Sequence, residues 1–259
     1  MKEKEQTTEL QKTGANMLAT QSDAPAGFED EEQGDFIIPR VKVIQTLSPE
    51  RKDKIAEEGA ILNSLTKEKL NGKSFVPVFK FSNNIDWKSR NDGGGMLCYS
   101  KDGKIGRVLA TDEIKQCAIC KRCEFDNTKQ GSEAIPKCTK YINFFGFFEG
   151  ERFPIILSFS KTSYNEGKKL FSLAKVTMQN MWHNKYVLNA KLEKKGNNEW
   201  YIPVVTIAGP VSEEDRQFGA QLYKSFRGVE FKADLPEDEN SAAAADEVAS
   251  PDQLKKSEF

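Results

Sequence analysis

Four of the chain's five cysteines lie in one short stretch, CAICKRCEFDNTKQGSEAIPKC, with the spacing Cys117-x2-Cys120-x2-Cys123-x14-Cys138. Two cysteines separated by two residues bind a metal ion through a tight turn, and thiolates from farther along the chain complete a tetrahedron around zinc. The polar loop before Cys138 gains order mainly from a cross-link, which a metal ion provides. We therefore predict one zinc ion bound by these four cysteines. The site would be structural, because four thiolates leave no open position for catalysis.

Other uses of these cysteines remain open. An iron–sulfur cluster also suits the spacing, although the Cys-Pro ending of bacterial ferredoxins is missing. A redox switch favours a more isolated pair. Disulfides rarely persist in a reducing cytosol, where we expect the chain because its first residues, MKEKEQTTEL, lack the apolar core of a secretory signal. The fifth cysteine, Cys98 in MLCYS, is interpreted as a small buried hydrophobe that could replace one of the four ligands.

Charge is distributed unevenly along the chain. The formal net charge is −1, but residues 1–35 carry nine acids against three lysines, and residues 229–259 carry the same numbers. Each end therefore has a net charge of −6, which leaves +11 on residues 36–228. A basic body between two acidic ends favours a polyanionic ligand, above all nucleic acid. No run of about 18 apolar residues is present, so a transmembrane helix is excluded.

Single-stranded nucleic acid is bound by cations that contact phosphates and by exposed rings that stack on bases. The basic body contains both, although most phenylalanines in strands belong to a core. Trp87 and Tyr141 are the favoured rings because each lies next to a lysine. The predicted contacts are Arg40, Lys42, Lys80, Trp87, Lys88, Arg90, Tyr141, Lys161, Lys168 and Lys169.

Enzyme chemistry finds little support in the sequence. His183 is the only histidine, which removes most general-base schemes. NEGKKL at 165–170 lacks the preceding glycine of a phosphate-binding loop, and the three glycines at 93–95 lack the spacing of a dinucleotide fingerprint. We therefore predict a protein that is not an enzyme.

The secondary structure predicted for residues 36–228 is mainly β. A helix over 162–181, capped by Thr162 or Ser163, and a last helix beginning at Ser212 complete it. The predicted strands and hairpins are FIIPRVKVIQ (36–45), KSFVPVFKFS (73–82), a hairpin turning at Asp102–Gly103, a hairpin over 141–160 turning at Glu149–Gly150, and a strand pair over 184–209. Five or six strands with a helix after the third predict an α+β fold, an OB-like Greek-key barrel with the zinc loop inserted at 117–138. Residues 1–35 and 229–259 are predicted to be disordered acidic ends.

With these features the chain resembles the phage-type single-stranded-DNA-binding proteins. In the T-even phage group a zinc subdomain is inserted into an oligonucleotide-binding barrel that precedes an acidic C-terminal tail. The C-terminal sequence DQLKKSEF is similar to the acidic, Phe-ended tails of the T-odd phage and bacterial groups. That resemblance implies that Glu258 and Phe259 contact partner proteins. The T-even site, however, uses a histidine with three cysteines, and Lys255 and Lys256 dilute the acidity here.

The sequence thus predicts sequence-independent binding of single-stranded DNA in phage-type replication or recombination. The acidic tail would regulate binding and recruit replication or recombination proteins, in the cytoplasm of a bacterial host and without a membrane partner. Two alternatives remain. One is a zinc-ribbon protein that binds a polymerase or transcription factor, and the other is a nuclease or recombination enzyme with an iron–sulfur cluster.

Overall fold

A computed structural model describes residues 37–88, 94–125, 128 and 134–229. The predicted contact Arg90, the tail residues Glu258 and Phe259, and the acidic arm 1–35 lie outside these residues. The chain divides between Ile37 and Ile38 into two units, and every element described below belongs to the second.

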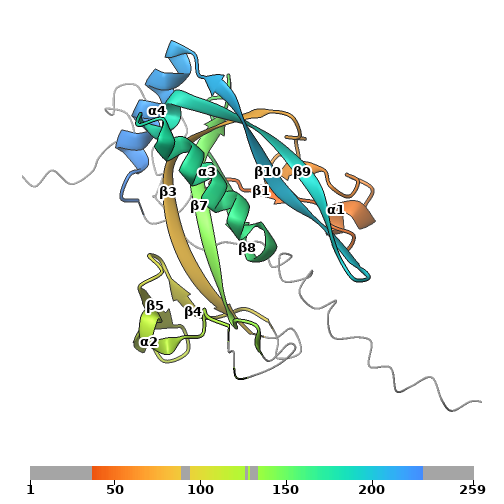
Figure 1. The fold of residues 1–259 in the computed structure, drawn as a ribbon, viewed down its shortest axis with the longest axis vertical. Coiled ribbons are helices and arrows are strands. Elements are labelled where there is room, and N and C mark those ends of the chain that lie inside the picture. Colours follow the sequence, from red (N-terminus) through yellow and green to blue (C-terminus); the bar gives the residue numbers. More distant parts are fainter. Residues whose placement is uncertain (1–36, 89–93, 126–127, 129–133, 230–259) are drawn as a thin grey trace, which may run out of the picture. The chain divides into compact units, whose positions relative to one another are not determined.

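The described elements form two antiparallel sheets (Figure 1). The small sheet pairs β1 with β2. In the large sheet the order is β10-β9-β3-β4-β5-β6, with β7 paired to both β3 and β8. The strands are β1 (Val41–Val43), β2 (Ile61–Asn63), β3 (Ser74–Trp87), β4 (Met96–Ser100), β5 (Ile105–Val108), β6 (Ile114–Gln116), β7 (Cys138–Phe148), β8 (Ile155–Ser160), β9 (Asn184–Lys195) and β10 (Asn198–Pro210). The helices are α1 (Pro49–Lys52), α2 (Cys117–Cys120), α3 (Tyr164–Val176) and α4 (Glu213–Phe226), with 3-10 turns η3 (Lys161–Ser163) and η4 (Met181–His183).

These elements confirm the mainly β prediction, including the three hairpins and both long helices. They do not confirm the OB-like barrel, because the strands described here do not close into a barrel. One strand explains the difference. β3 is 14 residues long and pairs with β9 near its start, with β7 along most of its length and with β4 near its end. The sheet therefore divides at β3, with β9 and β10 beside its start and β4, β5 and β6 beside its end, and it does not close.

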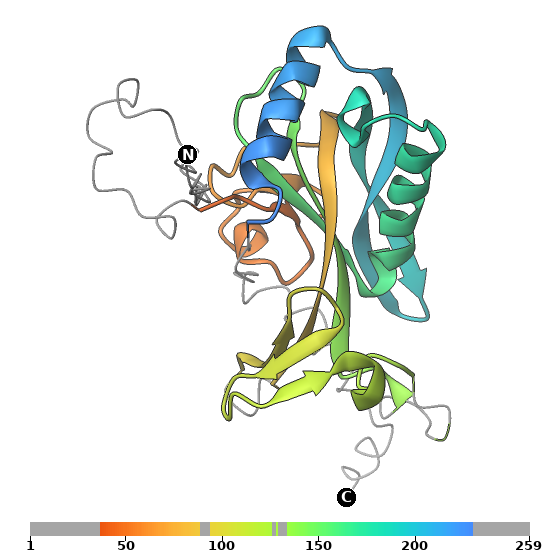
Figure 2. The same cartoon turned by 90° about the vertical axis from the view of Figure 1, so that its left-hand side faces the viewer.

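The long strands β3 and β7 lie between two helices, α3 on one face and α4 on the other (Figure 2). Ser212 caps α4 by accepting a hydrogen bond from the Asp215 backbone N–H at 3.2 Å. Acidic residues fill the first turn of α4 and Lys224 its last, as the helix dipole favours. On α3, Leu170 and Ala174 are buried against the sheet.

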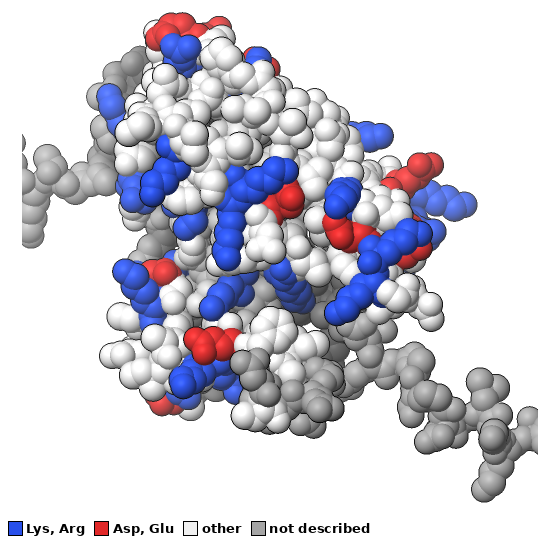
Figure 3. All heavy atoms as spheres, in the orientation of Figure 1, with Lys and Arg blue, Asp and Glu red and all other residues white. Residues whose placement is uncertain are grey.

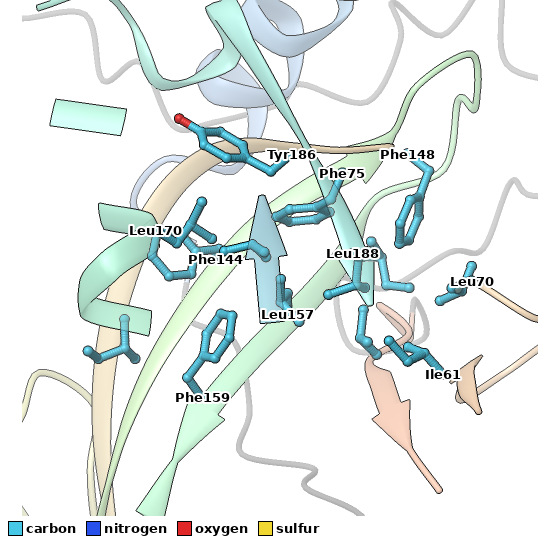
Figure 4. Packing of buried hydrophobic residues seen from close by; sticks show 14 of the residues in the cluster. Ile61, Leu70, Phe75, Phe144, Phe148, Leu157, Phe159, Leu170, Tyr186 and Leu188 are labelled. Carbon is cyan, nitrogen blue, oxygen red and sulfur yellow. The ribbon is translucent and has the colours of Figure 1, made fainter. Parts of the chain in front are cut away.

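The main core lies under α3 and extends toward β9 and β10 (Figure 4). It is rich in aromatic residues from β3, β7 and β8, with Phe144 and Phe159 in edge-to-face contact at 5.9 Å between ring centroids. The buried rings of the hairpin over 141–160 thus serve mainly as core.

Candidate nucleic-acid interface and cysteine pocket

One face of the large sheet carries both candidate sites. Residues directly opposite each other on antiparallel strands point to the same side, and the side alternates along each strand. Lys80, Ser82, Asn84 and Asp86 therefore share one face of β3, the face that α3 covers in part. We call it the α3 face.

A groove of about 330 Å³ lies on the α3 face, between the sheet and α3. Tyr164, Lys168 and Phe171 are spaced by four and three residues, so they lie along one side of the helix. The residues that line the groove are Lys80, Ser82, Ile142, Tyr164, Lys168, Phe171 and Ser172.

Each of the two groove lysines lies over an aromatic ring. Lys80 Nζ is 5.4 Å from the centroid of the Phe171 ring, and Lys168 Nζ is 5.1 Å from that of Tyr164. Lys80 Nζ also donates a hydrogen bond to Ser82 Oγ at 3.0 Å. Phe171 is 36% exposed and Lys168 is exposed. Ammonium groups beside accessible rings are the combination that binds phosphates and stacks bases of single-stranded nucleic acid.

Several other predicted contacts lie on the surface but outside this groove. Lys161 is exposed in η3, just before α3. Lys169 is exposed and its Nζ lies 3.2 Å from Glu166 Oε2. Lys88 is exposed after β3, and Trp87 is half-buried against the small cluster formed by Ile85 and its neighbours.

The structure places three of the predicted contacts in buried positions. Tyr141 is 3% exposed, in a cluster on the sheet face opposite α3. Lys42 is 7% exposed and its Nζ lies 2.9 Å from Glu50 Oε2. Arg40 is also buried, and its Nη1 donates to Ser158 Oγ at 3.3 Å. The two basic groups, Lys42 and Arg40, therefore interact within the fold.

Sequence reasoning did not identify Tyr164, Phe171 or Lys140 as site residues. The i, i+4, i+7 spacing of Tyr164, Lys168 and Phe171 is visible in the sequence and could have indicated the two rings. Lys140 lies opposite Asn84 and is exposed, which places it on the α3 face between the groove and the cysteines. No local pattern indicates that position, because strand register determines it.

A pocket of about 190 Å³ lies farther along the α3 face and is lined by all five cysteines. The sheet contributes two of them. Cys98 on β4 and Cys138 on β7 are each directly opposite Asp86 of β3, so the three side chains form a row across one face. The other three cysteines, Cys117, Cys120 and Cys123, belong to α2 and the turn after it. The predicted metal ligands are therefore brought to one cavity, together with Cys98.

The thiols of this pocket interact with one another. The Cys138 thiol donates a hydrogen bond to the Cys123 sulfur, which lowers the pKa of Cys123. The same hydrogen bond, together with burial, raises the pKa of Cys138. Burial also raises the pKa of Cys98, with further contributions from the nearby Cys117 and Asp86.

Asp86 is the acidic residue that lines this pocket, beside Lys115 and Arg122, and it is 4% exposed. Its Oδ2 accepts hydrogen bonds from Arg122, with both Nε and Nη2 at 2.7 Å. Its buried Oδ1 has no hydrogen-bond partner among the described residues. In their present positions, the Cys, His, Asp and Glu side chains described here form no group of three or more that could hold a metal ion.

The groove and the cysteine pocket follow one another along β3. Lys80 and Ser82 line the groove, whereas Asn84 and Asp86 line the pocket. On this side of the molecule, lysine and arginine side chains lie over α3 and between it and the part that contains β4, β5 and α2 (Figure 3). The α3 face thus presents a cationic path from α3 toward the cysteines.

The chain's only histidine, His183, lies in η4 and lines neither pocket. No helix in the described part of the chain is both long and apolar enough to cross a membrane.

The fold and the two sites together define a mainly β, antiparallel protein with an aromatic, lysine-lined groove and a cysteine pocket on one sheet face. The chain matches the family model of the Pam3 phage gp34-like proteins over residues 4–232, and it belongs to this family. The predicted association with phages is thereby confirmed. No curated protein and no solved structure matches the chain.

Proposed function

We propose that this protein binds single-stranded DNA without sequence preference and that it acts in phage DNA replication or recombination without being an enzyme. The observation that carries the proposal is the groove on the α3 face. Lys80 and Lys168 lie there with Phe171 and Tyr164, in the pairing of cation and ring that single-stranded polynucleotides require.

The charge distribution supports the same ligand. The net charge of +11 on residues 36–228 lies between ends of −6 each, so the body attracts a polyanion. Lys140 extends the basic surface beyond the groove along the same sheet face. A single DNA strand bound in the groove would therefore contact further cations, such as Lys140, as it continues toward the cysteines.

Titration of the full chain with labelled poly-dT and with duplex DNA, across a salt series, tests this proposal. We expect poly-dT to bind more tightly than duplex, with an affinity that falls steeply as salt rises. If both lysines contact phosphates, the double variant Lys80→Ala/Lys168→Ala should lower the log–log salt slope by about 1.4, since each single-strand contact contributes about 0.7.

Phe171→Ala should have a different effect in the same titration. Loss of one stacked base weakens binding by about 1–3 kcal/mol and leaves the salt slope unchanged, because no phosphate contact is lost. The control for the lysines is Lys224→Ala, an exposed lysine of α4, which packs on the opposite sheet face. The control for the ring is Phe153→Ala, since Phe153 is 39% exposed and does not line the groove. Equal effects of groove and control variants, or no affinity for poly-dT in dilute buffer, would overturn the proposal.

A further inference from the structure

Cys98 does not behave as an isolated buried hydrophobe. It is half-buried, and its sulfur lies in the same cavity as the other four. A Cβ atom placed on Gly106 would lie 2.9 Å from Cys98 Sγ and 3.7 Å from Cys117 Sγ. Both sulfurs thus reach the same space above Gly106, although their residues come from β4 and from the start of α2.

One carboxylate, Asp86, lines the cavity together with the cysteines, Lys115 and Arg122. Asp86 is buried beneath the thiols, and Arg122 engages only its Oδ2. The buried Oδ1 accepts no hydrogen bond from any described residue. Arg122 already places a positive charge beside this carboxylate, so what Oδ1 lacks is a hydrogen-bond donor or a ligand. Once deprotonated on metal binding, the surrounding cysteine sulfurs are soft ligands, which select zinc over magnesium or calcium.

The surrounding lobe also lacks a core of its own. We define the cysteine lobe as residues 96–123, which contain β4, β5, β6 and α2. Among the described residues, none from β5, β6 or α2 belongs to a hydrophobic core cluster. Ile105, Ile114 and Ile119 are instead 54%, 59% and 73% exposed. A small unit with so little buried apolar surface needs a cross-link to hold its shape.

We propose that the cysteine pocket binds one zinc ion and that Cys98 is one of its ligands. Cys117 and Cys120 are two further ligands, and the hydrogen-bonded pair Cys123 and Cys138 provides the fourth. Asp86, held by Arg122, remains beneath the ion as an outer partner. Because no three of these side chains now converge on one point, the thiols must rotate toward the cavity centre when the ion binds. This assignment is independent of DNA binding, and its test uses no DNA.

Substitution of cobalt for zinc in the full chain reports the number of cysteine ligands through the intensity of the thiolate-to-cobalt charge-transfer band. Metal-free protein titrated with Co²⁺ should bind one equivalent, with a thiolate-to-cobalt charge-transfer band and the visible spectrum of a tetrahedral site. Cys98→Ser should lose about a quarter of the charge-transfer intensity, since one of four thiolates is removed, and should bind zinc more than about 100-fold more weakly. That loss exceeds the range of about 10–100-fold that is typical of an outer-shell residue. Circular dichroism of each variant reports whether it is folded.

Alkylation of the unmutated chain provides a test that does not depend on a variant folding. Thiol alkylation followed by mass spectrometry should modify Cys98 slowly when zinc is bound and faster after a chelator removes it. Equal modification with and without zinc would overturn the role of Cys98, as would a folded Cys98→Ser protein with unchanged cobalt spectrum and affinity. A brown protein that contains iron and sulfide after anaerobic purification would overturn zinc as the bound metal.

Discussion

At the scale of single residues, burial decides how a charged side chain is used. Glu50 is 4% exposed and lies between two lysines. Its Oε1 accepts hydrogen bonds from Lys42 Nζ at 3.1 Å and from Lys67 Nζ at 3.0 Å. Lys42 is itself almost fully buried, so its charge is neutralised within the fold. A sequence pattern of alternating basic residues cannot distinguish this use from contact with a phosphate.

The Glu50 site predicts a pH dependence of stability. Burial alone would raise the pKa of Glu50, but hydrogen bonds from Lys42, from the backbone and from Lys67 together outweigh it and hold the pKa below the ordinary value of 4.5. A carboxylate with a depressed folded-state pKa stabilises the protein above its unfolded pKa, and that contribution is lost as the pH falls through the folded value. Stability should therefore fall below pH 4.5.

Urea unfolding of the wild type and of Glu50→Gln measures this contribution. At neutral pH the variant should be less stable by about 3 kcal/mol, because Lys42 is left as an uncompensated buried charge. The difference should shrink as the pH falls, since the wild-type carboxylate then becomes neutral too. A difference that stays constant from pH 7 to pH 3 would contradict the role assigned to Glu50.

At the scale of elements, an irregularity in β3 determines which residues reach the groove. The pairing of β3 with β7 shifts register between Pro77 and Phe79, so Val78 is an extra residue in the strand. Both Val78 and Phe79 consequently lie in the core cluster under α4. Phe75 before the shift and Lys80 after it can then occupy the same sheet face, one in the core and one in the groove.

Gly146 lies opposite this irregularity, paired with Pro77, and has no room for a side chain. A Cβ there would lie 2.3 Å from the Val76 carbonyl oxygen and 2.7 Å from Phe75 Cζ. A backbone carbonyl in a paired strand cannot rotate away, so the strands would have to separate. Gly146→Ala should therefore destabilise the protein by about 1–3 kcal/mol or more, as overpacked cores do.

Thermal unfolding measures this effect, and poly-dT affinity of the folded variant reports whether Lys80 has kept its place. An unfolding temperature for Gly146→Ala equal to that of the wild type would show that the strands tolerate the methyl group. The backbone at the register shift could then move enough to relieve the contacts of the added methyl group with Val76 and Phe75.

At the scale of the whole molecule, the charge asymmetry predicts competition between the C-terminal residues and DNA. Residues 229–259 have a net charge of −6, against +11 on residues 36–228. We propose that this acidic segment competes with DNA for the basic surface and also recruits partner proteins through Glu258 and Phe259. Truncation after residue 229 should therefore strengthen poly-dT binding at low salt, with a smaller gain at high salt, where charges are screened.

A matched variant separates charge from length. Replacement of the nine acids of this segment by their amides keeps its length and should reproduce the effect of truncation. If the truncated chain binds poly-dT no more tightly than the full chain in dilute buffer, the segment does not compete for the groove.

Local features of the sequence determined much of this protein. The hairpin turns, the two long helices, the start of the last helix at Ser212 and the mainly β content depend on residues close in the chain, and all were predicted. The four clustered cysteines were predicted to share one site, and they line one cavity. The charge of the body and of the ends follows from composition alone.

Only the tertiary structure decided the rest, because it depends on register between distant strands. The branched pairing of β3 leaves the sheet open, and the shift at Val78 sets which side chains face α3. Cys98 and Cys138 lie far apart in the sequence. The pairing of β3 with β4 and with β7 places them on either side of Asp86. A one-residue change of register would move each of these side chains to the other face, and no local pattern specifies it.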